Sequence, residues 1–78
     1  MRKKEEKAVI TFHTTAAAMA AEKACKEAGL PGRLIPVPRQ LSAGCGFAWC
    51  SGPEWKQKLE ELLRERKVEY EESCVLFI

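Results

Sequence analysis

The distribution of apolar and polar residues along the chain predicts six secondary-structure elements. Residues 8–13 are rich in β-branched and aromatic side chains, which favours a strand. Two further apolar segments, residues 33–38 and 47–50, also predict extended structure. Residues 68–78 predict a last strand, interrupted by two glutamates. Helical periodicity fills the two long intervals between these strands.

The first predicted helix has recognisable signals at both ends. A hydroxyl at Thr14 or Thr15 caps its start, and the helix runs to about Ala28. Gly29 follows, where a helix end favours a left-handed residue. Small apolar side chains recur at helical spacing and predict a stripe that packs closely against a sheet. The members of this stripe are Ala17, Ala18, Ala21, Ala24, Cys25 and Ala28.

The second predicted helix begins near Pro53. Proline is tolerated in a first helical turn, and the following glutamate favours the positive end of the helix dipole. Glu60 and Arg64 are four residues apart, which predicts an ion pair on the solvent side. The predicted buried stripe consists of Trp55, Leu59, Leu62 and Leu63.

The order β-α-β-β-α-β predicts a ferredoxin-like α+β fold, a four-stranded antiparallel sheet in the order 4-1-3-2 with two helices on one face. Pro36 and Pro38 remove backbone donors from the second strand, which independently requires a sheet edge. We expect the first and third strands to be central, adjacent and parallel. The chain is expected to comprise a charged tail, residues 1–7, and one domain, residues 8–78.

Composition and charge narrow the range of functions. The 78 residues carry 13 basic and 11 acidic side chains, a net charge of +2, and four of the basic residues lie within residues 1–7. The nearly neutral body lacks the basic face that nucleic-acid binding requires. The start has no apolar run and no segment is long enough to span a membrane, so we expect neither a signal peptide nor a membrane protein. A cytoplasmic location is expected, where the four cysteines stay reduced.

Cys45 is the leading candidate for a functional residue. Gly44 and Gly46 flank it and leave its thiol and the nearby backbone N–H groups uncovered. Arg39 and Ser42 precede it by six and three residues. A guanidinium and an anion-binding glycine loop would together stabilise a thiolate, a persulfide or a selenide.

Cys50 and His13 form a second candidate site. If the first and third strands are parallel, these residues lie at one end of the sheet, where both helices also begin. A helix N-terminus lowers the pKa of a thiol, and the thiolate is the nucleophile. The C-x4-C spacing of Cys45 and Cys50 is neither a redox C-x2-C pair nor half of a paired zinc motif. Cys25 and Cys74 are expected to be structural thiols.

Residues 10–15, 21–23, 29–31 and, most strongly, 34–46 carry a family resemblance. Their most specific part is a P-R-x-x-S-x-x-C-G run, formed here by Pro38, Arg39, Ser42, Cys45 and Gly46. Over almost the whole chain past Lys7, the sequence resembles the putative selenium/sulfur carrier protein-like family of small bacterial domains. The resemblance implies that Cys45 is the carrier thiol, with Arg39 and Ser42 around it, whereas Cys50 falls outside the run.

These observations predict a thiol-based carrier of sulfur or selenium, not an enzyme with its own turnover. Cys45 would accept the atom from a desulfurase-like donor protein as a persulfide or selenosulfide and pass it to an acceptor protein by contact. Cys50 is an optional resolving thiol, and no cofactor is expected. The alternative is a non-catalytic interaction or metal-binding module with Cys45, Cys50 and His13 as ligands. A thiol oxidoreductase is disfavoured because the chain has no C-x2-C motif.

Overall fold

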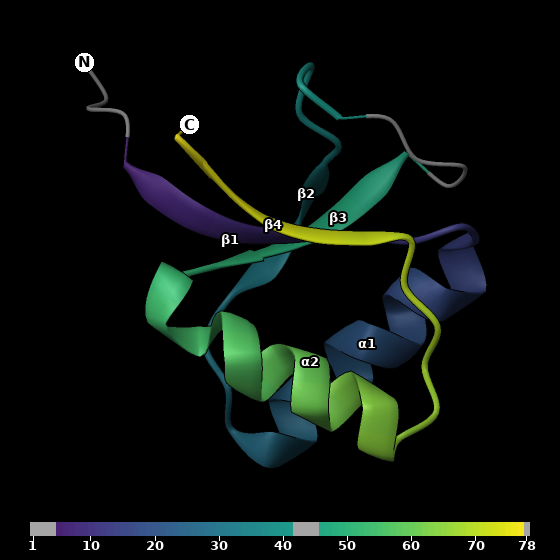
Figure 1. Cartoon of the computed structure of the whole chain (residues 1–78). Helices are drawn as coiled ribbons and strands as arrows, with labels where there is room; N and C mark the ends of the chain where they lie inside the picture. The colour runs from purple at the N-terminus through teal and green to yellow at the C-terminus, as the bar shows by residue number, and fades with distance from the viewer. Residues whose placement is uncertain (1–4, 42–45, 78) are drawn as a thin grey trace.

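The structure is a computed structural model, and it describes residues 5–41 and 46–77. Its secondary structure follows the predicted β-α-β-β-α-β order (Figure 1). The first strand begins and ends two residues earlier than predicted, and the second helix begins as a short 3-10 helix. The elements are β1 (Glu6–Thr11), α1 (Thr15–Ala28), β2 (Arg33–Pro36), β3 (Phe47–Ser51), η1 (Pro53–Trp55), α2 (Lys56–Glu65) and β4 (Glu72–Phe77).

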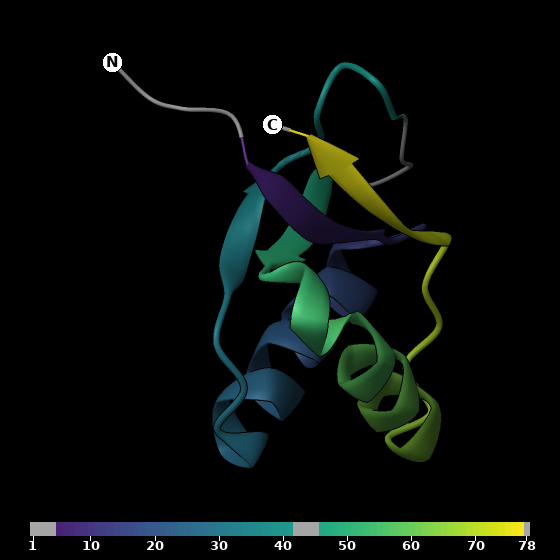
Figure 2. The same cartoon turned by 60° about the vertical axis from the view of Figure 1, so that its left-hand side comes forward.

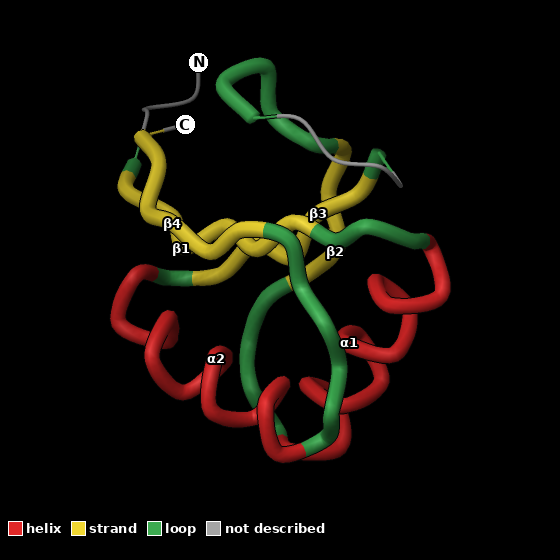
Figure 3. Tube along the Cα trace, turned by 45° about the vertical axis from the view of Figure 1, so that its right-hand side comes forward, coloured by secondary structure: helices red, strands yellow, loops and turns green. Residues whose placement is uncertain are grey.

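The strands of the described chain form a four-stranded antiparallel sheet in the order β2-β3-β1-β4. This is the predicted order, counted from the opposite edge. β2, which contains Pro36, lies at one edge as its composition required, and β4 lies at the other. The helices α1 and α2 both pack against the same face of the sheet (Figures 1 and 3). The α+β class is therefore confirmed.

The predicted parallel pairing of the first and third strands is wrong. β1 and β3 are adjacent but antiparallel, with Val9 opposite Cys50 and Thr11 opposite Ala48. β3 pairs antiparallel with both of its neighbours, β1 and β2, so these two strands run in the same direction with β3 reversed between them. β1 and β3 therefore end at opposite ends of the sheet, and the helices that follow them, α1 after β1 and α2 after β3, also begin at opposite ends.

The ends of α1 form as predicted. The Thr14 hydroxyl accepts a hydrogen bond from the N–H of Ala17 at 3.1 Å. Gly29 adopts a left-handed conformation with φ of 74°, and its N–H donates to the carbonyls of the last turn. The predicted stripe is buried as far as Cys25, with Ala17 half-buried, but Ala28 is exposed because it lies beyond the last buried position of the helix.

The hydrophobic core lies between the sheet and the helices. Its large side chains are Ile10, Phe12, Trp49, Leu59 and Leu63, each at most 2% exposed. Complete burial of a side chain of this size contributes about 1.5–3 kcal/mol to folding. The alanines of α1 complete this core, whereas the predicted stripe members Trp55 and Leu62 are only partly buried at its margin.

Glu60 faces β4 and does not form the predicted ion pair with Arg64. Its Oε2 accepts hydrogen bonds from Lys56 Nζ at 2.7 Å and from Ser73 Oγ at 2.6 Å. The carboxylate therefore bridges the first turn of α2 to the edge strand. The sequence periodicity predicted that Glu60 lies on the solvent side of the helix. It could not predict that this part of the helix lies next to β4.

Candidate functional site

The sheet face turned away from the helices carries two of the cysteines. Trp49 lies in the core on the helix side, so the next residue of β3, Cys50, points to the opposite face. Directly paired residues share a face. Cys50 pairs with Val9, and Val9 pairs with Cys74, so both thiols lie in one row across β3, β1 and β4. We call this side of the sheet the open face.

Cys50 and Cys74 are too far apart to form a disulfide with each other. They are separated by two strand spacings, roughly 10 Å between Cα atoms, whereas a disulfide requires less than about 7 Å. Both are free thiols in the structure, as is the buried Cys25 on α1. The part of the chain that the structure describes thus carries three separate thiols.

The surroundings of Cys50 and Cys74 favour the protonated form. Burial raises the pKa of Cys50, and the positive charges of Lys7 and Arg33 offset this only in part. Burial also raises the pKa of Cys74, and the neighbouring Glu72 carboxylate raises it further, against a small opposing effect of Lys56. Since the thiolate is the nucleophile, neither residue is activated at neutral pH.

The prediction that Cys50 is activated by a helix N-terminus is therefore wrong. Cys50 lies within β3, and α2 begins only at Lys56, after η1. Its side chain lies on the face opposite the helices, so the helix dipole does not point at the thiol. The pKa of Cys50 is raised and not lowered.

His13 lies far from Cys50. Cys50 is level with Val9, and His13 lies four residues further along the chain, two residues past the end of β1, which corresponds to roughly 13 Å of extended backbone. His13 is exposed, and its Nδ1 lies 3.6 Å from Glu71 Oε1. A metal ion needs ligand atoms within about 2.0–2.3 Å, so His13 and Cys50 cannot bind the same ion in this fold. In the described ranges no three histidine, cysteine or acidic residues are grouped for metal binding.

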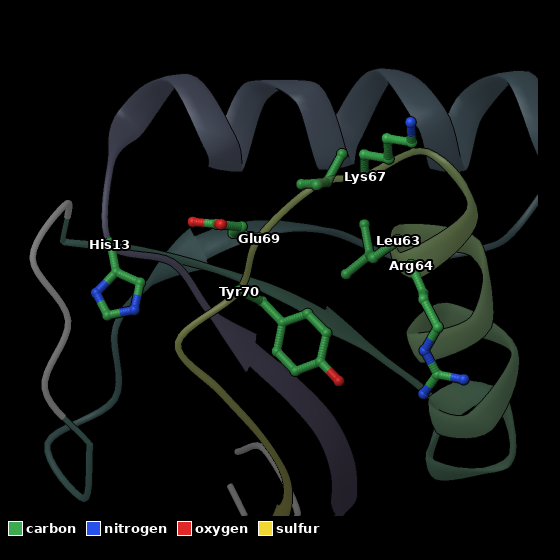
Figure 4. Close-up of a pocket in the computed structure, with 7 residues that line it drawn as sticks. His13, Leu63, Arg64, Lys67, Glu69 and Tyr70 are labelled. Carbon is green, nitrogen blue, oxygen red and sulfur yellow. The ribbon is translucent and has the colours of Figure 1, made fainter.

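His13 instead lines an open pocket of about 580 Å³ beside the C-terminal end of α2. Figure 4 shows the His13 imidazole, the Tyr70 ring and the Arg64 guanidinium around it. None of the described residues that line this pocket is a cysteine. The pocket is thus separate from the thiols of the open face.

The segment between β2 and β3 carries the leading candidate, Cys45. Ser42, Gly44 and Cys45 lie outside the residues that the structure describes. The ends of this segment are described: the N–H of Val37 donates to the carbonyl of Gly46 at 3.0 Å, which closes the segment at its base. In Figure 3 the described parts rise on the side of the sheet away from the helices.

Arg39 lies at the exposed tip of a turn in this segment. The N–H of Leu41 donates to the carbonyl of Pro38 at 3.0 Å, so Arg39 is one of the two central residues of the turn. Gly46 at the other end has a φ of 79°, a left-handed conformation that favours glycine. Arg39 and Gly46, two residues of the P-R-x-x-S-x-x-C-G run, therefore have defined backbone positions near the two ends of the segment.

Two features of the open face could not be read from the sequence. Thr11 is completely buried, and its hydroxyl has no hydrogen-bond partner within the described structure. Cys74, predicted to be only structural, shares a row with Cys50. The alternation of side chains along the sequence of a strand indicates which of its residues lie on the same face of the sheet. The register between strands, which aligns Cys74 with Cys50, becomes known only from the structure.

A family model described as "Putative Se/S carrier protein-like" matches residues 7–74. The match spans most of the chain, including α1, β2, β3, α2 and all but the first residue of β1. No curated protein and no solved structure gives a significant match. No helix in the described ranges has the length and apolar character to cross a membrane.

Proposed function

The chain belongs to the putative Se/S carrier protein-like family, and from this premise we propose that it carries sulfur or selenium on Cys45. The loaded form is a persulfide or selenosulfide, received from a donor protein and delivered to an acceptor protein. The observation that carries the proposal is the family match, which includes the whole P-R-x-x-S-x-x-C-G run.

The geometry around the run supports this proposal. The Val37–Gly46 hydrogen bond anchors the segment that contains Cys45 to the adjoining strands β2 and β3. The described ends of the segment lie on the open face, which α1 and α2 leave uncovered. Arg39 is exposed on the same segment and provides a cation for an anionic cargo. A protein that delivers its cargo by contact requires such an accessible position.

The three thiols that the structure describes are poor nucleophiles. Burial raises the pKa of Cys25 to about 11, and the pKa values of Cys50 and Cys74 are raised as well. These cysteines are therefore largely protonated at neutral pH, when a carrier thiol must attack. The raised pKa values count against Cys25, Cys50 and Cys74 as the loading site.

The loading step is a sulfur transfer without net oxidation. The Cys45 thiolate attacks the terminal sulfur of a persulfide on the donor protein. A new S–S bond forms at Cys45, the S–S bond of the donor breaks, and the donor cysteine leaves as a thiolate. Delivery repeats this exchange with an acceptor thiolate as the nucleophile. Cys50 is the candidate resolving thiol, whose attack on Cys45 Sγ would release the outer sulfur as hydrosulfide and leave a disulfide.

Intact-mass measurement after incubation with a cysteine desulfurase and cysteine tests the proposal. We expect Cys45→Ser to abolish the added mass and Cys50→Ser to retain it. Arg39→Ala should reduce the loaded fraction by a modest factor, because the exposed cation is screened by solvent. Arg33→Ala is the matched control, since Arg33 is an exposed cation in the row of Cys50.

Measurements on the same variants also show which outcomes would contradict the proposal. If Cys45→Ser loads as well as the parent while Cys50→Ser and Arg33→Ala lose loading, the carrier thiol is Cys50. If neither cysteine variant changes the loaded fraction, neither Cys45 nor Cys50 is the loading thiol and the proposal is wrong.

A further inference from the structure

The edge strand β4 lacks the proline, lysine or bulge that commonly prevents edge strands from associating, and its one charged residue, Glu72, is at its first position. It pairs with β1 on one side, and no described strand lies on the other (Figure 2). Its six residues include no proline and no basic residue. Val75 and Phe77 keep 42% and 61% of their surface exposed. An unprotected apolar edge of this kind is a template for pairing with another strand.

The opposite edge of the same sheet is protected. β2 contains Pro36, which cannot donate a backbone hydrogen bond, and the exposed cation Arg33. Directly after this strand, the N–H of Val37 donates a hydrogen bond to the carbonyl of Gly46. The two edges of the sheet therefore differ in chemistry, and only β4 offers a regular backbone ladder.

We propose that β4 pairs antiparallel with β4 of a second copy of this chain, which extends one continuous sheet through both molecules. Two antiparallel copies of the same strand are related by a two-fold axis. Each copy therefore presents the same surface to the other, as a two-fold symmetric dimer requires. A two-fold axis perpendicular to the sheet keeps the helices of both copies on the same face. In this arrangement, residues that lie directly opposite each other are on the same face of the sheet. Because side chains alternate between the faces, the possible registers differ from one another by two residues.

Among these registers, we propose the one with Cys74 opposite Cys74 of the second copy, which is compatible with the charges along the strand. Glu72 of one copy then lies opposite Leu76 of the other, and Leu76 pairs with Lys7 in β1. Lys7, Leu76 and the second copy's Glu72 thus share one row of the open face, with opposite charges at its two ends. The two copies of Glu72 are about 13 Å apart along the strands, so no like charges lie opposite each other.

Sedimentation velocity of the whole chain under reducing conditions tests the dimer. The parent should change from monomer to dimer as its concentration rises from low micromolar to near millimolar. Val75→Lys and Phe77→Glu should each weaken association by at least about tenfold, because each places a charge at the edge on both copies, and Phe77→Glu places it opposite Glu71 of the second copy. Far-UV circular dichroism confirms that each variant is folded.

Met19→Lys is the matched control. Met19 is also an apolar residue, 60% exposed, but it lies on α1 and away from β4. Its substitution should leave association unchanged. A parent that stays monomeric at every concentration overturns the proposal. So does a dimer that survives both β4 variants, or one that Met19→Lys dissolves. Association only with a different protein, without self-association, also contradicts it.

Cross-linking tests the register. Opposed residues of an antiparallel pair have Cα atoms about 4.5–5.5 Å apart, within the range of a disulfide. In the variant with Cys45→Ser and Cys50→Ser, diamide should take two electrons and two protons from the Cys74 thiols and produce a covalent dimer. A dimer that forms in solution but gives no Cys74 cross-link overturns the proposed register.

Discussion

At the scale of single residues, burial determines which thiol can react. Cys25 is completely enclosed between α1 and the sheet, and this burial raises its pKa to about 11. Cys50 and Cys74 are half-buried on the open face, with pKa values that are raised by the same cause. The reactivity of a cysteine in this chain thus follows its position relative to the sheet.

Alkylation of the native protein should therefore distinguish the cysteines. We expect iodoacetamide to label Cys45 first and Cys50 and Cys74 more slowly, with rates that increase as the pH rises. Cys25 should stay unlabelled, because at pH 8 only about one molecule in a thousand carries its thiolate and the side chain is enclosed. Time-resolved peptide mass spectrometry measures each rate. Equal rates for Cys25 and Cys45 would contradict this assignment.

Gly32 is a residue that tolerates no side chain. Its φ is 133°, and an added Cβ would lie 2.7 Å from both the carbonyl oxygen of Cys50 and Trp49 Nε1. We expect Gly32→Ala to lower the free energy of unfolding by about 2–4 kcal/mol, from overpacking and backbone strain together. Gly29→Ala is the control, because Gly29 also has a positive φ but nothing lies within 4 Å of an added Cβ. Its cost should be about 1 kcal/mol. Urea denaturation that gives equal costs would refute the steric explanation.

At the scale of elements, the carboxylate of Glu60 connects α2 to β4. The hydrogen bond from Lys56 is the main cause that lowers the pKa of Glu60, and the bond from Ser73 adds to it. A carboxyl whose pKa is lower in the folded state stabilises the fold above the pKa of the unfolded chain. This stabilisation is lost as the pH falls through the folded-state value.

Glu60→Gln should therefore destabilise the protein in a pH-dependent manner. At pH 7 we expect a loss of about 1 kcal/mol in the free energy of unfolding. The difference from the parent should disappear in acid, where the carboxylate is protonated in both states. Glu61→Gln is the neighbouring control, since the hydrogen bond that Glu61 accepts from Gln57 is exposed and 3.4 Å long. A Glu60→Gln difference that is the same at acidic and neutral pH would contradict the bridging role.

The elements were predictable where local chemistry decides them. Thr14 and Gly29 set the ends of α1, and Pro36 sent β2 to an edge. The direction of β3 relative to β1 depends on connections across the whole chain, and the parallel pairing was an incorrect inference about them. That one error also placed His13 beside Cys50, so the second candidate site failed with it.

At the scale of the whole molecule, the two sides of the sheet carry different parts of the protein. The helices and the core occupy one side of the sheet, and the described ends of the segment between β2 and β3 and the row of Cys50 and Cys74 occupy the other. The chemistry that the sequence motif predicts for Cys45 and Arg39 stays a prediction. The motif could not predict that Cys74 shares the row with Cys50, because this depends on strand register.

The account rests on Cys45 as the position of the added atom, and locating that atom is its most direct test. The parent protein is loaded with a cysteine desulfurase and cysteine, alkylated to trap the persulfide, and digested with trypsin. Cleavage after Arg39 and Lys56 leaves Cys45 and Cys50 in one peptide, residues 40–56, so fragment ions between them must assign the sulfur. We predict the added sulfur on Cys45. An added sulfur on Cys50, or on the separate peptides that contain Cys25 and Cys74, would contradict the account.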